Sequence, residues 1–143
     1  MARTHGKNAN FSYNGVALES FIDSITQTAS VAESDITSFN DSWQNFIAGK
    51  KNITTEISGS ADFSHGASGS DQTLFEGIGA GVKTTVFDPT GSGPATNDPE
   101  YTCTASGLTG VLITNYSVSL PVGEKASFTA SLQHSGSTTR VVA

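Results

Sequence analysis

Charged side chains, cysteines and long apolar runs are all scarce in this chain. Asp, Glu, Lys and Arg make up 14% of the 143 residues, whereas roughly 25% is usual in soluble proteins. Ser, Thr, Gly and Asn take the place of the missing charges. Acids outnumber bases by 13 to 7, and a net negative charge disfavours non-specific binding to nucleic acid.

The lack of cysteines and apolar runs narrows the protein class further. The single cysteine, Cys103, cannot form an internal disulfide, which fits a reducing compartment. No apolar run reaches the length of a membrane span. The opening residues MARTHGKNANF contain no apolar core of the kind found in signal peptides. We therefore expect a protein made in the cytoplasm, with no membrane partner.

Catalytic and metal-binding patterns are also missing. His5, His65 and His134 have no second metal ligand at the usual spacing, so we expect exposed loop histidines rather than a metal site. Glu56 and Asp62 share a strand face but lie roughly 20 Å apart along an extended chain, too far to share catalytic work. The sequence predicts no enzymatic activity, no metal and no cofactor.

Alternating apolar and polar residues predict a mainly β protein with six or seven strands. The expected fold class is an antiparallel β-sandwich or partly closed barrel with one short flanking α-helix, a long inter-strand loop and extended terminal arms. Asp71 is the expected N-cap of the helix. The expected strands lie within residues 16–31, 52–63, 81–87, 101–113 and 114–133, the last range holding two. The remaining segments are an N-terminal arm (1–15), a helix (71–78), a breaker-rich loop (88–100) and a C-terminal tail (136–143), with one domain over 16–135.

A long polar segment separates the first two expected strands. ESDITSFNDSWQNFIAGKK is acidic, then aromatic, and ends in Gly-Lys-Lys. Its Asn and Asp residues are poor helix formers, so residues 33–50 are expected to form a loop with at most one helical turn. Its aromatic residues argue against disorder. Trp43, Phe46 and Ile47 either fold back to cap the protein's own core or insert into a neighbouring subunit.

In several expected strands, every second residue is apolar and the residues between them are short and carry hydroxyl groups. In SVSLPVGEKASFTASLQ, residues 117–133, the strand residues that alternate with the apolar ones are almost entirely Ser and Thr. Strands around 26–30 and 54–62 repeat the pattern. Exposed strand faces usually include long charged side chains that prevent aggregation. The face is either an ordinary solvated surface or a specialised one. Its expected residues are Thr54, Glu56, Ser58, Ser60, Asp62, Ser117, Ser119, Ser127, Thr129 and Ser131.

The order and spacing of three segments resemble a known protein family. The segments are DITSFNDSWQNFIAGKKNITTEISGSADF, DQTLFEGIGAGVKTTVFDP and TGVLITNYSVSLPVGEKASFTASLQHSGSTTR. Together they resemble the major tail tube proteins of long-tailed, non-contractile bacteriophages over roughly residues 16 to 140. The resemblance lies in the order of features and in the closing hairpin rather than in any single motif.

The resemblance implies a structural virion protein of the phage tail, made in the host cytoplasm. Such proteins form hexameric rings that stack into a tube for DNA ejection, with their inner sheets joined into a barrel around the lumen. It implies a tape-measure protein, a tail terminator and baseplate proteins as partners, and genomic DNA that passes without specific binding. It places the hydroxyl residues in the lumen and the long loop between subunits. The inter-subunit residues would be Arg3, Asp35, Phe39, Asp41, Trp43, Phe46, Ile47, Lys50 and Lys51, the two aspartates lying near basic residues.

Two other functions fit a β-sandwich of this size. One is a binding module, such as a carbohydrate-binding or adhesin domain, which would need an exposed aromatic platform on a sheet face. The water-facing strand positions expected here hold Ser and Thr instead. The other is a hydrolase, for which the residues offer little support.

Overall fold

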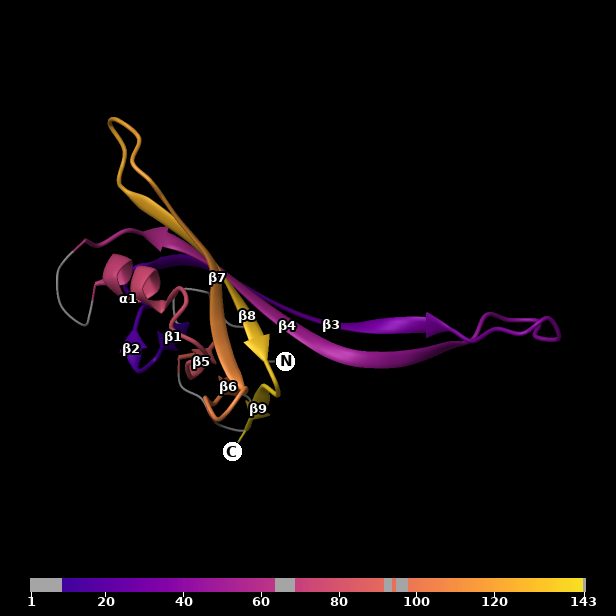
Figure 1. The fold of residues 1–143 in the computed structure, drawn as a ribbon. Coiled ribbons are helices and arrows are strands. Elements are labelled where there is room, and N and C mark those ends of the chain that lie inside the picture. Colours follow the sequence, from indigo (N-terminus) through magenta and orange to yellow (C-terminus); the bar gives the residue numbers. More distant parts are fainter. Residues whose placement is uncertain (1–8, 64–68, 92–93, 95–97, 143) are drawn as a thin grey trace.

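The computed structural model describes residues 9–63, 69–91, 94 and 98–142. Within them, strands alternate with one short helix along the chain (Figure 1). The elements are β1 (Asn10–Tyr13), β2 (Val16–Ala17), β3 (Ile22–Asp35), β4 (Phe46–Ser60), α1 (Ser70–Gly77), β5 (Thr85–Asp88), β6 (Glu100–Cys103), β7 (Gly110–Ser119), β8 (Ser127–Ser135) and β9 (Thr139–Val141). The expected mainly β class with one short helix is confirmed.

The strands form two sheets whose paired neighbours are all antiparallel. Sheet one has the order β2-β1-β5-β6-β9, and sheet two has the order β3-β4-β8-β7. The two sheets pack as a sandwich, and α1 lies beside them at one end of the body (Figure 1). β3 and β4 continue far past the body as a two-stranded hairpin.

The core lies between the two sheets and is built from alternate strand residues. Ile57, Phe128 and Leu132 point inward from sheet two, while Phe11 and Tyr13 point inward from sheet one. Because alternate residues of a strand face opposite sides, the same strands must turn their Ser and Thr residues outward. Over β8, the alternate apolar residues expected within 117–133 are therefore the ones that point into the core.

The N-terminal segment begins its regular structure earlier than expected. Residues 10–13, expected to belong to an arm, form β1, with Phe11 and Tyr13 in the core. The sequence signal for this strand is the Asn14-Gly15 pair. The positive φ angles of these residues, 52° and 80°, make a two-residue hairpin turn between β1 and β2. Arg3 lies outside the described residues.

The short helix is confirmed, but its N-cap was assigned to the wrong residue. α1 begins after Gly69, which makes no side-chain cap. Asp71 lies in the first turn, where its Oδ1 accepts a hydrogen bond of 2.7 Å from the hydroxyl of Tyr116 on β7. Burial and the Asp71 carboxylate both raise the pKa of Tyr116, so it stays a neutral donor. This bond ties the helix to sheet two.

His134 is a core residue, and the expectation of an exposed loop histidine is wrong for it. β8 runs on to Ser135, which puts His134 on the buried parity with Leu132. Its Nε2 lies 2.8 Å from the hydroxyl of Thr55, and its Nδ1 lies 2.8 Å from the hydroxyl of Thr138. Burial lowers the pKa of the imidazole, which favours the neutral ring. His5 and His65 lie outside the described residues.

We expect the buried His134 to make folding stability depend on pH. Below about pH 6.5 the unfolded chain binds a proton that the folded chain resists, so the free energy of unfolding should fall as the pH drops. His134→Gln should flatten this fall between about pH 7 and pH 5, because it removes the titrating group. Urea unfolding at a series of pH values measures both profiles. Parallel profiles for the two proteins would contradict the assignment.

Candidate functional site: a hydroxyl face and a projecting arm

The face of sheet two that points away from the core carries rows of short hydroxyl residues across all four strands. Ser58 on β4 pairs with Ser24 on β3 and with Thr129 on β8, and Thr129 pairs in turn with Ser117 on β7. Ser117 Oγ and Thr129 Oγ1 lie 2.9 Å apart, so neighbouring hydroxyls hydrogen-bond across strands. Directly paired residues point to the same side of a sheet, which makes these rows one continuous surface.

We call this surface the hydroxyl face. Its rows, read from β3 towards β7, are Ser24, Ser58, Thr129 and Ser117; Thr26, Glu56, Ser131 and Asn115; Thr28, Thr54, Gln133 and Leu112; and Ser60, Ser127 and Ser119. Leu112, which is partly buried, is the one apolar residue in these rows. Glu56 is the one charged residue among them, and it is exposed. Asp62, expected on the same face, lies beyond the end of β4, where its N–H donates to Ser70 Oγ at 2.8 Å. None of the residues in these rows is aromatic, so the face offers no platform for stacking a sugar.

A salt bridge lies at the border of the hydroxyl face. Lys125 Nζ, just before β8, is 2.8 Å from Asp23 Oδ2 on β3. Asp23 lies at an irregularity in the β3–β4 register, between Ile22 and Ser24. Both side chains are more than half exposed, so the pair adds little to stability. Its effect is to pair a lysine at this border with a carboxylate.

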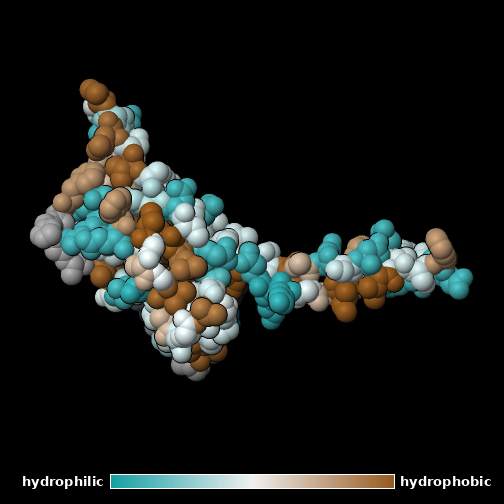
Figure 2. Space-filling view, viewed as in Figure 1, coloured by the Kyte–Doolittle hydropathy of each residue, from teal (hydrophilic) through white to brown (hydrophobic). Residues whose placement is uncertain are grey.

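The segment expected to be a loop at 33–50 is mostly β-hairpin. β3 and β4 stay paired out to Asp35 and Phe46, with a register shift between Val31 and Glu33, and only residues 36–45 form a loop. Every residue from 28 to 52 is exposed. We call residues 28–52 the arm; it leaves the body as a narrow projection (Figures 1 and 2). A strand without a buried face has no reason to alternate apolar and polar residues, which is why the pattern did not predict it.

Two carboxylates order the loop at the end of the arm. Asp35 Oδ1 accepts the N–H of Thr37 at 2.8 Å, and Asp41 Oδ2 accepts the N–H of Ser38 at 2.8 Å. Asp41 Oδ2 also accepts from the Asn45 side chain at 3.1 Å. These hydrogen bonds hold the pKa of both carboxyls below the usual value. Within this one chain the two aspartates bind their own loop, and their approach to basic residues of a neighbour stays a prediction.

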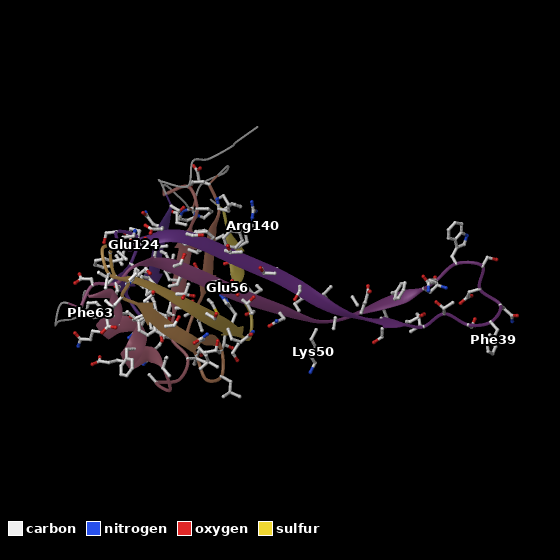
Figure 3. The ribbon with its side chains drawn as sticks, turned by 90° about the horizontal axis from the view of Figure 1, so that it is seen from above. Phe39, Lys50, Glu56, Phe63, Glu124 and Arg140 are labelled. Carbon is white, nitrogen blue, oxygen red and sulfur yellow. The ribbon has the colours of Figure 1, made fainter. Side chains whose placement is uncertain are left out.

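The aromatic residues of the arm do not fold back onto the protein's own core. Trp43 is 84% exposed and Phe39 is fully exposed at the far end of the arm (Figure 3). Val31, Ile36, Phe46 and Ile47 are each about half exposed or more. The self-capping alternative is therefore wrong. Figure 2 shows a group of hydrophobic atoms on one side of the middle of the arm, with hydrophilic atoms on the opposite side.

Other kinds of site find little support. Over the described residues, no group of three His, Cys, Asp or Glu side chains could hold a metal ion. In the same part of the chain, no helix has the length and apolar character needed to span a membrane. Cys103 is buried, and its Sγ lies 3.5 Å from the carbonyl oxygen of Ser137. The notable surfaces are thus the hydroxyl face and the arm.

Comparison with known proteins gives matches in structure rather than in sequence. No protein-family model matches the chain, and no curated protein matches it significantly. Among solved structures, it superposes on a chain from the tail of an empty gene transfer agent particle with C6 symmetry, with a TM-score of 0.75 and 12% identity, covering 98% of this chain and 100% of that one. It superposes on the SPP1 tail tube with a TM-score of 0.71 and 12% identity, covering 99% of this chain and 80% of that one.

A contractile assembly gives a similar match. The sheath-tube complex of the PVC extracellular contractile injection system aligns with a TM-score of 0.69 and 9% identity, over 99% of this chain and 93% of that one. Identities this low report the fold rather than the activity. At the level of the fold, these matches confirm the resemblance drawn from the sequence. The chain has the fold seen in phage tail tubes and in the tube of a contractile injection system.

Proposed function

We propose that this chain is the structural subunit of a bacteriophage tail tube. Six copies form a ring, and rings stack into a hollow tube through which DNA passes without specific binding. The observation that carries this proposal is the hydroxyl face, in whose rows Glu56 is the one charged residue, on a sheet whose outer strands β3 and β7 leave much of their outer edges unpaired within the described residues. The shared fold with tail tube chains supports the same conclusion.

The open edges of sheet two support closure into a ring. Apart from bridges of Ile113 and Val111 to residues 78 and 83, no described strand pairs with the outer side of β7, and β3 is open on its outer side. Neither residues 114–119 nor residues 24–32 include a charged side chain. Exposed edge strands normally carry such charges to prevent pairing with other chains. Pairing of β7 with β3 of the next copy removes both edges and continues the hydroxyl face around a bore.

The chemistry of the hydroxyl face suits a conduit for DNA. Each Lys or Arg contact with a phosphate would add affinity through the release of counterions and would slow passage. Ser and Thr keep the wall hydrated without holding phosphates, and Glu56 repels them. Lys125 is already paired with Asp23. The proposed lumen residues are therefore those of the hydroxyl face, with Asp62 near one end.

The proposed location and partners follow from the same assignment. The subunit is made in the host cytoplasm and ends in the virion tail, where the tube meets a tape-measure protein, a terminator and a baseplate. Solved structures with the same fold include chains of a tube-terminating cap and of a baseplate of the anti-feeding prophage. The proposed role is structural and requires no enzymatic activity.

Electron microscopy of the concentrated protein tests the proposal together with the role of Trp43. The unaltered chain should form rings or hollow tubes, and a persistent monomer would contradict the proposal. Trp43→Ala should prevent tube growth, because the indole is exposed in the single chain and can contribute chiefly to a contact between copies. Its melting temperature should stay unchanged.

Leu108→Ala is the matched control for Trp43→Ala. Leu108 is also strongly exposed but lies on the body, outside the arm. This variant should assemble like the unaltered chain. If Trp43→Ala assembled normally as well, the arm would not be an interface.

Lysine substitutions on the hydroxyl face test its role in the lumen. Ser58→Lys and Thr129→Lys occupy one cross-strand row and point away from the core, so tubes should still form. Genome delivery should slow, because each lysine adds a phosphate contact that is repeated in every copy. Infectivity and the rate of DNA ejection measure the effect. Unchanged ejection in both variants would refute the lumen assignment.

A further inference from the structure

The turn between β1 and β2 holds the one asparagine of the chain that is followed by glycine, Asn14. Asparagine is chemically labile, because the peptide nitrogen that follows it can attack its side-chain amide carbon. A side chain at the following position hinders this approach, and glycine has none. The other asparagines are followed by Ala, Phe, Asp, Ile or Tyr. The sequence around Asn14 is therefore the one that favours deamidation most.

The folded turn leaves both reacting groups accessible. Asn14 and Gly15 are exposed, and among the described residues nothing lies within 4 Å of the position that a Cβ on Gly15 would take. In the same part of the chain, neither the side-chain amide of Asn14 nor the N–H of Gly15 has a hydrogen-bond partner. The attacking nitrogen and the amide carbon are thus not protected by a hydrogen bond that the described residues make.

The peptide unit between Asn14 and Gly15 is also the part of the turn that is least held. On one side, the N–H of Asn14 donates to the carbonyl oxygen of Thr84 at 2.8 Å, and Tyr13 pairs with Val16 across the turn. The carbonyl of Asn14 and the N–H of Gly15 take part in no hydrogen bond among the described residues. Rotation of this peptide unit, which the attack requires, therefore breaks no hydrogen bond within them.

We propose that Asn14 is a site of spontaneous deamidation and isomerisation in the folded chain. The nitrogen of Gly15 loses its proton and bonds to Cγ of Asn14, and the side-chain nitrogen leaves as ammonia. Water then adds to one of the two carbonyl carbons of the resulting succinimide ring, and the bond from that carbon to the ring nitrogen breaks. Breakage at Cγ gives aspartate, and breakage at the main-chain carbonyl carbon gives isoaspartate. The inference does not depend on the proposed tube.

Isoaspartate would lengthen the main chain at a turn that joins two core segments. It inserts the Cβ of residue 14 into the main chain between Tyr13 and Val16, whose pairing fits a two-residue turn. Tyr13 is 1% exposed, and Leu18, just after β2, is fully buried with its N–H bonded to the carbonyl oxygen of Phe11 at 2.9 Å. A longer turn displaces these side chains from their packed positions. Aspartate leaves the main chain unchanged and adds only a charge at an exposed position.

Peptide mapping by mass spectrometry tests the site. After incubation of the folded protein at mildly alkaline pH, the fragment with Asn14 should convert to the acid form about tenfold faster or more than fragments with Asn40 and Asn115. These two asparagines are also exposed, one in a loop and one in a strand, but precede Asp and Tyr. The rate at Asn14 should rise with pH, because the attacking nitrogen must lose its proton. Equal rates at the three asparagines would overturn the proposal.

Two variants test the structural consequence. Asn14→Gly cannot deamidate and keeps a sequence suited to the two-residue turn, so its melting temperature should not change on incubation. Asn14→Asp carries the new charge on an unchanged main chain and should melt close to the fresh unaltered chain. The incubated unaltered chain should melt about 2 °C or more below both variants, because only it contains isoaspartate. If it melts together with incubated Asn14→Gly although Asn14 has reacted, the effect of isoaspartate on the core is refuted.

Discussion

The pairing of β3 with β4 is longer than the body that can cover it, and most of the molecule's surface properties follow from that mismatch. The two strands have 14 and 15 residues, whereas strands of 3 to 10 residues are usual. Their inner parts supply half of sheet two and pack on sheet one. Their outer parts form the arm, in which both faces are exposed. Within the described residues, one chain therefore folds a core and still leaves apolar side chains of the arm exposed and parts of the outer strand edges unpaired.

The strand edges and the exposed side chains of the arm would be covered by different kinds of contact. The edges of β3 and β7 offer backbone groups, whose pairing depends on strand geometry rather than on particular side chains. The arm offers aromatic and aliphatic side chains, whose burial depends on the shape of the surface that receives them. Under the proposed function, the backbone contacts close a ring and the side-chain contacts hold rings together. The carboxylates of Asp35 and Asp41 order the arm loop within the single chain, which under the same proposal would lower the entropy lost when the arm binds a neighbouring copy.

How far the sequence predicted this structure depended on whether a segment buries one face. The alternation over 127–133 predicted β8 and its hydroxyl parity, because one face is in the core. Residues 33–50 were expected to form a loop, whereas most of them belong to β3 and β4, and neither face of this part of the hairpin is buried. β1 was missed although Asn14-Gly15 marks a hairpin, and His134 was misjudged because its partners Thr55 and Thr138 are brought to it only by tertiary packing.

The same reasoning explains how the fold persists at about 10% identity to the solved tube structures. A sandwich of this kind needs apolar residues on the side of sheet two that faces the core and polar residues on the other side, and many sequences meet that requirement. Edge pairing adds no requirement for specific side chains. Under the proposed function, contacts between the arm and a neighbouring copy are more demanding, because a bulky aromatic such as Trp43 must meet a matching surface. Under that function, differences among subunits of this fold should therefore concentrate in the arm.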